Sequence, residues 1–272
     1  MEHRSIAFIG AGNMARSIIA GLVASGYPAS QITATAPSAE RREPLARDYG
    51  IHTDSDNLRA AQQADVVVLA VKPQLMENVC QPLQSIDFSG KLVISIAAGI
   101  SAARLQEMLA AQVSLVRVMP NTPSLIGQGM SGMYANDAVS EADRTFSDSL
   151  MRAVGETCWV SEESGINGVI AAAGSAPAYF FLFMEAMQNE AIRQGFDKDT
   201  ARALVQQAAA GAAGMVIANP ETELSTLREQ VTSKGGTTAE AIRTFNESQL
   251  SDIVAKAMQA AVSRAQEMEK LF

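Results

Sequence analysis

Hydrophobic positions follow one pattern up to about residue 163 and another beyond it. In the first part, short apolar runs alternate with amphipathic stretches, a pattern typical of buried strands separated by helices. Beyond residue 164 the strand-like runs stop, and alanine-rich stretches with helical spacing take over. We therefore predict an α/β domain over 1–163, with a doubly wound, mostly parallel sheet, and an all-helical domain over 164–272. The predicted strands are Ser5–Ile9, Ile32–Thr35, Asp65–Val71, Lys91–Ile96, Leu115–Val118, Met130–Tyr134 and Thr157–Val160.

A glycine turn and a helix follow the first predicted strand. Apolar residues at helical spacing predict that this helix runs from Asn13 to Ser25. In the pattern G-x-G-x-x-A, Gly10 permits a tight turn, Gly12 lets the backbone approach a pyrophosphate, and Ala15 lets helix and strand pack closely. The helix N-terminus offers free N–H groups to phosphate oxygens. The pattern therefore predicts dinucleotide binding, against the simpler alternative of an ordinary glycine-rich turn.

The end of the second predicted strand bears on which dinucleotide is bound. Sites selective for NAD carry Asp or Glu there, where the carboxylate binds the ribose hydroxyls. Here the strand ends at Thr35 without an acid, and the residues that follow include a serine and two arginines, Ser38, Arg41 and Arg42. These groups suit a 2′-phosphate, so we predict NADPH as cofactor, with NADH as the weaker alternative. The competing interpretation is that both arginines lie on the solvated face of a helix running to Tyr49.

Two further strand ends carry candidate cofactor contacts. Lys72 follows the run Asp65–Val71 and is predicted at a carboxyl end of the sheet, where doubly wound folds bind ligands. Ala97 and Ala98 follow the run Lys91–Ile96, and their small side chains permit the close approach of a flat ring such as nicotinamide. The alternative for Lys72 is an ordinary solvated loop residue.

Composition excludes several classes of function. The net charge of −8 argues against nucleic acid or an anionic membrane as partner. The two histidines, His3 in the N-terminal tail and His52 in a polar loop, are predicted to be solvated, so neither a Ser-His triad nor a metal site is expected. Cys80 and Cys158 lack C-x-x-C spacing and are interpreted as buried small hydrophobes in a reduced compartment, the cytoplasm. We expect no signal peptide and no uninterrupted apolar run long enough to span a membrane.

The helical half contains one unusually apolar stretch. A helix is predicted over Ile166–Ala173, a break at Gly174–Pro177, and a second helix over Ala178–Arg193 that is apolar nearly all round. Such a helix must be buried, so it is assigned to the core or to a subunit interface. Further helices are predicted over Asp199–Ala218 and Asp252–Lys270.

A Ser/Gly/Thr loop lies between two further helical segments of this half. The loop runs through Ser233, Gly235 and Gly236 to a helix predicted over Thr238–Glu247. Backbone N–H groups and hydroxyls at such a loop make a good anion-binding site. The alternative is a structural turn in which Thr237 is the N-cap.

At this point the motifs resemble a known family. The chain resembles pyrroline-5-carboxylate reductase along nearly its full length. The matching motifs are 9–15 (IGAGNMA), 70–74 (AVKPQ), 117–123 (RVMPNTP), 174–179 (GSAPAY) and the segment 227–238. Two positions depart from the family's usual residues: Ala176 stands for Gly, and Lys234 stands for Pro and adds a positive charge beside the predicted substrate site.

The resemblance implies an N-terminal Rossmann domain and a helical dimerisation domain, with NADPH and pyrroline-5-carboxylate as ligands. It further implies a homodimer, with a decamer of five dimers as a possible larger assembly. The implied cofactor-binding residues are Ile9, Gly10, Ala11, Gly12, Asn13, Met14, Ser38, Arg41, Asn57, Ala70, Val71, Lys72, Pro73, Ile96, Ala97, Ala98 and Gln230. The implied substrate-binding residues, contributed across the dimer, are Glu221, Ser233, Gly235, Gly236, Thr237 and Thr238, with the Thr238 hydroxyl as the candidate catalytic group at the ring nitrogen.

Two other functions remain alternatives. β-Hydroxyacid dehydrogenases resemble the chain in architecture, but they carry a catalytic lysine on the long helix after a glycine motif, and no lysine occurs here between Lys91 and Lys198. A non-catalytic nucleotide sensor could use the same fold as a binding module. An assay with pyrroline-5-carboxylate and NADPH separates all three functions.

Overall fold

The computed structural model describes residues 3–271 and divides the chain into two compact units. One comprises the residues up to Ser175 together with the segment from Ala261 onward, and the other is Ala176–Ala260. The boundary predicted between residues 163 and 164 falls in the loop that precedes helix α7, Gly165–Val169.

The first unit is built on an eight-stranded sheet, within the described residues, in the order β3-β2-β1-β4-β5-β6-β7-β8. All neighbouring strands are parallel except β6 and β7, which are antiparallel. The strand order reverses beside β1, and ligands of such sheets bind at the carboxyl ends at this switch point. The strands are β1 Ile6–Ile9, β2 Ile32–Thr35, β3 His52–Asp54, β4 Val66–Leu69, β5 Leu92–Ser95, β6 Ser114–Met119, β7 Gly129–Ala135 and β8 Gly155–Trp159.

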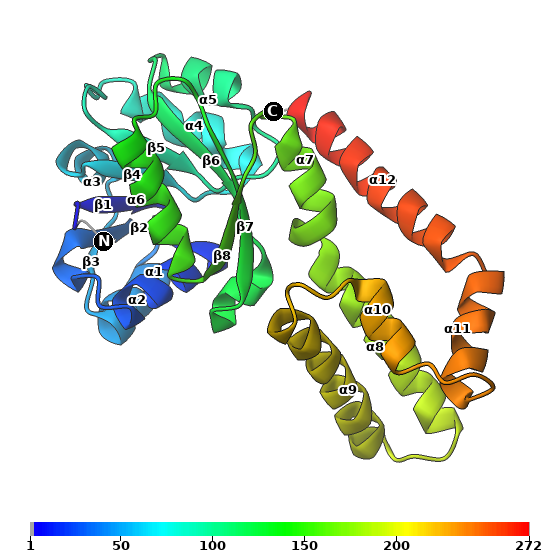
Figure 1. Ribbon diagram of the computed structural model, residues 1–272. Helices are drawn as coiled ribbons and strands as arrows, with labels where there is room; N and C mark the ends of the chain where they lie inside the picture. Colours follow the sequence, from blue (N-terminus) through cyan, green and yellow to red (C-terminus); the bar gives the residue numbers. More distant parts are fainter. Residues whose placement is uncertain (1–2, 272) are drawn as a thin grey trace. The chain divides into compact units, whose positions relative to one another are not determined.

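Helices cover both faces of this sheet, as Figure 1 shows. Alternate residues of β1 enter opposite cores: Ile6 and Phe8 join one buried cluster, and Ala7 and Ile9 join the other. Burial on both faces explains why the central strands are continuous apolar runs. The helices of this unit are α1 Asn13–Ala24, α2 Ala39–Tyr49, α3 Asn57–Gln63, α4 Pro73–Leu83, α5 Ala102–Leu109, α6 Glu141–Arg152 and α7, with η1 Ala29–Gln31, η2 Thr122–Ile126 and the π-helical turn η3 Ile170–Gly174.

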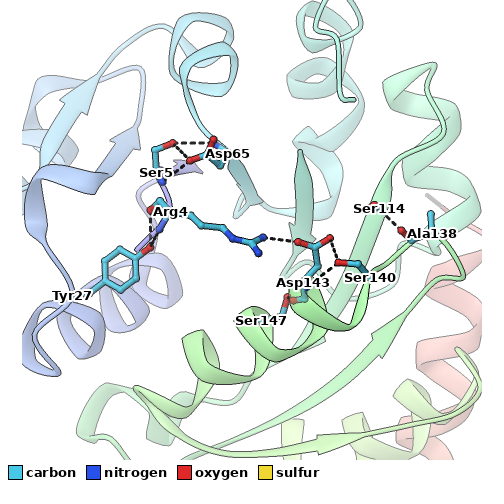
Figure 2. A network of polar contacts seen from close by, with 9 residues as sticks. All are labelled: Arg4, Ser5, Tyr27, Asp65, Ser114, Ala138, Ser140, Asp143 and Ser147. Atoms are coloured by element: carbon cyan, nitrogen blue, oxygen red, sulfur yellow. Dashed lines mark hydrogen bonds and ion pairs between the residues drawn. The ribbon is translucent and has the colours of Figure 1, made fainter. Parts of the chain in front are cut away.

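A polar network ties the start of β1 to α6 and to the chain before β4 (Figure 2). The Tyr27 hydroxyl donates to the Arg4 carbonyl oxygen at 2.6 Å, and the Arg4 guanidinium lies 2.5 Å from an Asp143 carboxylate oxygen. The Ser5 hydroxyl donates to Asp65 at 2.7 Å, and this bond lowers the pKa of the Asp65 carboxyl. The network fixes the first strand, and therefore the glycine turn that follows it.

The structure corrects two of the predictions for this unit, on His52 and Cys158, and confirms a third, on Cys80. His52 was expected in a loop, but it begins β3, a strand of polar residues that pairs with β2. Cys80 is buried, and burial raises the pKa of its thiol to about 12. Cys158, in contrast, is exposed, because its side chain points away from the core on β8.

The second unit consists of helices within the described residues. They are α8 Ala176–Arg193, α9 Lys198–Ala218, α10 Leu224–Gln230, α11 Thr237–Glu247 and the first part of α12 Leu250–Glu269, whose last turns belong to the first unit. The apolar side chains of α8 are exposed in the single chain, with Phe180 66% and Leu182 68% accessible. That exposure is what an intersubunit face would produce, whereas a helix in the core of one chain would be covered.

The break predicted at Gly174–Pro177 is only a local change of helix type. Residues 170–174 form the π-helical turn, a bend follows at Ser175, and α8 begins at Ala176. Because the helix continues, Gly165–Arg193 is long and apolar enough to cross a membrane, contrary to the sequence prediction. This test rests on length and composition alone, and helices of soluble proteins also pass it.

Candidate functional site

The glycine turn brings three strand ends together. The Gly10 N–H donates to the Thr35 carbonyl oxygen at 3.2 Å, and the Ala70 N–H donates to the Ile9 carbonyl oxygen at 2.9 Å. Gly10 has a φ of +115°, and a Cβ added there would lie 2.6 Å from the Ala70 carbonyl oxygen. Only glycine fits this position, since both the backbone conformation and the space exclude a side chain.

Gly12 is the N-cap of α1 and leaves its N-terminus open. Its φ of −79° and ψ of 177° are ordinary extended values. A Cβ added there would meet nothing within 4 Å in the described part of the chain. The first turn of α1 contains no acidic residue, and its N–H groups have no intrahelical partners. This open cradle fits a pyrophosphate, since glycine permits close approach and the helix N-terminus favours negative charge.

The tip of β2 meets the start of α3 beside this cradle. The Thr35 hydroxyl donates to the Asn57 side-chain oxygen at 2.6 Å. Ser38 is the exposed N-cap of α2, and its side chain makes no capping hydrogen bond in the described structure. Arg42 is held in place, because its guanidinium donates to the Ala36 carbonyl oxygen at 2.8 Å. Of the two arginines that the sequence offers to a 2′-phosphate, the exposed Arg41 is the one whose side chain is free to move toward it.

The ends of β4 and β5 lie next to this turn in the sheet. Lys72 is the exposed N-cap of α4, and Pro73 occupies the first helical position. The Ile96 N–H donates to the Leu69 carbonyl oxygen at 3.1 Å, which holds the segment after β5 against β4. The predicted cofactor residues of the first unit thus lie at or just after the carboxyl ends of the strands, or in the helices that begin there. They are Ile9, Gly10, Ala11, Gly12, Asn13, Met14, Ser38, Arg41, Asn57, Ala70, Val71, Lys72, Pro73, Ile96, Ala97 and Ala98.

The remaining predicted residues belong to the second unit. Gln230 ends α10, Glu221 precedes that helix, and the others lie in the loop between α10 and α11 or in the first turn of α11. Gly235 has a φ of +72°, and the Gly236 N–H donates to the Ser233 carbonyl oxygen at 3.0 Å. Gly236 is the N-cap of α11, so the alternative in which Thr237 caps this helix is wrong. Thr237 and Thr238 lie within the first turn instead, where Thr238 is half-buried. Glu221 and Gln230 are exposed.

One buried charged cluster of the first unit was missed by the sequence analysis. Arg117 on β6 is almost inaccessible and lies 2.5 Å from a Glu163 carboxylate oxygen and 3.6 Å from one of Glu269. Glu163 also accepts the Ala102 N–H at 2.6 Å. The cluster joins the sheet, the start of α5 and the end of α12. An arginine inside an otherwise apolar strand run was the available signal, because a buried guanidinium requires carboxylate partners.

A surface groove of about 370 Å³ lies elsewhere, at the C-terminal end of α5, and includes none of the predicted site residues. We give it no role, because the strand ends and the open helix terminus explain ligand binding better than its mixed polar lining does.

The fold and the cradle define a dinucleotide-dependent oxidoreductase with a separate helical domain. Residues 5–99 match the family described as NADP oxidoreductase coenzyme F420-dependent, and residues 163–268 match pyrroline-5-carboxylate reductase dimerisation. The pyrroline-5-carboxylate reductase of Vibrio alginolyticus is 73% identical over 272 residues, which cover all of both chains. The chain belongs to the pyrroline-5-carboxylate reductase family. This confirms the predicted fold class, the predicted family and the predicted NADP-dependent type of enzyme.

Solved structures and more distant relatives agree with this assignment. The pyrroline-5-carboxylate reductase of Coxiella burnetii is 42% identical, with a TM-score of 0.93 over 98% of this chain and 99% of that one. The Plasmodium falciparum enzyme, determined with NADP bound, is 26% identical, with a TM-score of 0.87 over 99% of each chain. The Escherichia coli enzyme is 35% identical over 98% of this chain and 99% of its own length. The dimerisation match also supports self-association through the helical half.

Proposed function

We propose that this chain reduces 1-pyrroline-5-carboxylate to L-proline with NADPH, the last step of proline biosynthesis. The observation that carries the proposal is a 73% identity to a named pyrroline-5-carboxylate reductase that extends over the whole of both chains. The open cradle at Gly12 supports it independently, because that cradle suits the pyrophosphate of the cofactor.

The first unit would hold the cofactor across the carboxyl ends of its parallel strands. The N–H groups at the start of α1 receive the pyrophosphate, and Ser38, Arg41 and Asn57 receive the adenosine phosphate. Val71, Lys72 and Ala97–Ala98 line the nicotinamide end. Bound NADPH supplies the hydride that reduces the carbon of the ring C=N bond.

The loop between α10 and α11 would hold the substrate. N–H groups at Gly235 and Thr237 donate to its carboxylate, while the Gly236 N–H holds the turn by its bond to the Ser233 carbonyl oxygen. Ser233, Glu221 and Gln230 surround the ring and the nicotinamide. The Thr238 hydroxyl hydrogen-bonds the ring nitrogen, or relays a proton to it from water, as negative charge moves onto that nitrogen. Its freedom from a capping role in α11 supports this assignment.

The assembly and location follow from the same family membership. The dinucleotide-binding domain is 1–163 and the dimerisation domain is 164–272. The chain forms a homodimer through the apolar face of α8, with a decamer of five dimers as the larger assembly, and it acts in the cytoplasm. Nucleic acid and anionic membranes are not partners, since the net charge of −8 repels both.

The test is the loss of absorbance at the NADPH band when the folded protein is mixed with pyrroline-5-carboxylate. We expect faster oxidation of NADPH than of NADH, and proline as the product. If NADP⁺ binds but neither nucleotide is oxidised, the chain is a nucleotide sensor. Oxidation of NADPH by the carbonyl form of a β-hydroxyacid, or reduction of NADP⁺ by the β-hydroxyacid itself, would favour the β-hydroxyacid dehydrogenase alternative.

A further inference from the structure

Thr35 occupies the position at which dinucleotide-binding sites distinguish NAD from NADP, through contacts with the adenosine ribose. It is the last residue of β2 and is fully buried. Its hydroxyl oxygen lies 2.6 Å from the Asn57 side-chain oxygen and 3.3 Å from both the Gly10 nitrogen and the Phe8 carbonyl oxygen. Where NAD-selective sites place a carboxylate that would face the ribose itself, this chain places a hydroxyl that faces another side chain.

The length of the Thr35–Asn57 contact fixes the orientation of the amide. A separation of 2.6 Å is typical of an O–H···O bond and is shorter than the usual N–H···O range. The Phe8 carbonyl is a weaker acceptor for the hydroxyl, because it lies 3.3 Å away. The hydroxyl therefore donates to the amide oxygen, and the amide nitrogen of Asn57 is on the opposite side. Asn57 is half-buried, and its nitrogen makes no hydrogen bond to the described residues.

We propose that Thr35 is a positioning residue that makes the chain selective for NADP. Its hydroxyl locks the Asn57 amide so that two N–H donors, and not an oxygen, are presented at the adenosine ribose. A 2′-phosphate accepts hydrogen bonds only, so it matches this orientation. A free 2′-hydroxyl gains less, since the locked amide cannot offer it an acceptor. The inference rests on the cofactor assigned under the proposed function.

The experiment is isothermal titration of the unmodified protein and four variants with NADP⁺ and NAD⁺, which differ only in the 2′-phosphate. Thr35→Val keeps the shape of the side chain and removes the hydroxyl, and Thr35→Ser is the matched control that keeps it. Asn57→Ala removes the amide, and the fourth variant combines Thr35→Val with Asn57→Ala. Melting temperatures of the ligand-free proteins are measured alongside.

We expect Thr35→Val to weaken NADP⁺ binding about tenfold while NAD⁺ binding changes less than about twofold, because a freed amide loses one charge-assisted bond. Thr35→Ser should bind both nucleotides as the unmodified protein does. In the Asn57→Ala background, Thr35→Val should have no further effect on NADP⁺, since Thr35 acts through Asn57.

Three results would overturn the inference. Equal losses for NADP⁺ and NAD⁺ in Thr35→Val would mean that the hydroxyl supports only the Gly10 turn. Additive effects in the double variant would mean that the two residues act separately. If Thr35→Val does not fold, Asn57→Asp replaces the outward nitrogen by an oxygen, and unchanged NADP⁺ affinity in that variant would refute the donor assignment. Failure of the unmodified protein to bind NADP⁺ would instead refute the proposed function.

Discussion

Alanine substitutions at the two turn glycines should separate folding from cofactor binding. At Gly10, an alanine must adopt a φ near +115° and place its Cβ 2.6 Å from the Ala70 carbonyl oxygen. Such backbone strain costs about 1–3 kcal/mol, and overpacking costs about the same again. The expected loss of about 4 kcal/mol corresponds to a melting temperature lower by about 10 °C for a chain of this size.

At Gly12, an alanine keeps an allowed conformation and meets no neighbour. We expect the melting temperature of Gly12→Ala to fall by only about 2–4 °C, since alanine is a poorer N-cap than glycine by about 1 kcal/mol. Its methyl group would nevertheless occupy the space through which the pyrophosphate approaches. Loss of one or two charge-assisted hydrogen bonds predicts NADP⁺ affinity lower by about tenfold to a hundredfold.

Differential scanning fluorimetry and NADP⁺ titration of both variants measure these effects. The reasoning would be refuted by a Gly12→Ala protein that melts far below the unmodified chain, or by one that retains full NADP⁺ affinity. A Gly10→Ala protein with unchanged stability would show that the close approach of Gly10 to Ala70 can relax at little cost.

Four further predictions concern other parts of the chain. Thr238→Ala should lower turnover by roughly tenfold to a thousandfold at constant NADPH affinity and melting temperature, while Thr238→Ser retains activity; unchanged turnover would leave Thr238 without a catalytic role. Arg41→Ala should raise the KM for NADPH and leave NADH nearly untouched, whereas Arg42→Ala should affect both through the Ala36 loop; similar profiles for the two variants would contradict this division. Leu182→Asp should dissociate the oligomer in light scattering, and a folded, active monomer of the unmodified chain at micromolar concentration would contradict the interface assignment. Arg59 donates to both carboxylate oxygens of Asp54 and lowers the pKa of that carboxyl to about 2, so the pair stabilises the fold above about pH 4 and this contribution is lost as pH falls towards 2. When the free energy of unfolding is measured with urea at several pH values, Asp54→Asn should reduce its slope against pH between about 4 and 2; an unchanged slope would show that the pair adds nothing.

The sequence pattern predicted the strands of the first domain well where a strand is buried on both of its faces. The run Asp65–Val71 became the strand Val66–Leu69, because a strand between two helical layers needs apolar residues on both faces. The strand β3 was missed for the opposite reason. His52–Asp54 is polar and lies at an edge of the sheet, and its strand conformation comes from pairing with β2. No pattern within residues 52–54 predicts that this segment pairs with β2.

The same distinction separates the predicted part of the site from the part that was missed. The glycine turn is contiguous in sequence, so its spacing alone indicated the cradle. The bond between Thr35 and Asn57 joins residues 22 positions apart, and the ion pair between Arg117 and Glu163 joins residues 46 apart. Such contacts depend on which strands become neighbours, and the sequence pattern identifies strands without fixing every partner.

An acidic chain can still hold a polyanionic cofactor because the relevant field is local. Several other helices carry acids in their first turns, among them Glu40 on α2 and Glu141 and Asp143 on α6. The first turn of α1 has none, and glycine at its N-cap leaves the N–H groups uncovered. Charges farther away than about 8–10 Å are largely screened at physiological ionic strength, so the net charge of −8 weighs little against donors in direct contact. Because the first turn of α1 carries no carboxylate, its N–H groups can meet the cofactor phosphates without a competing negative charge beside them.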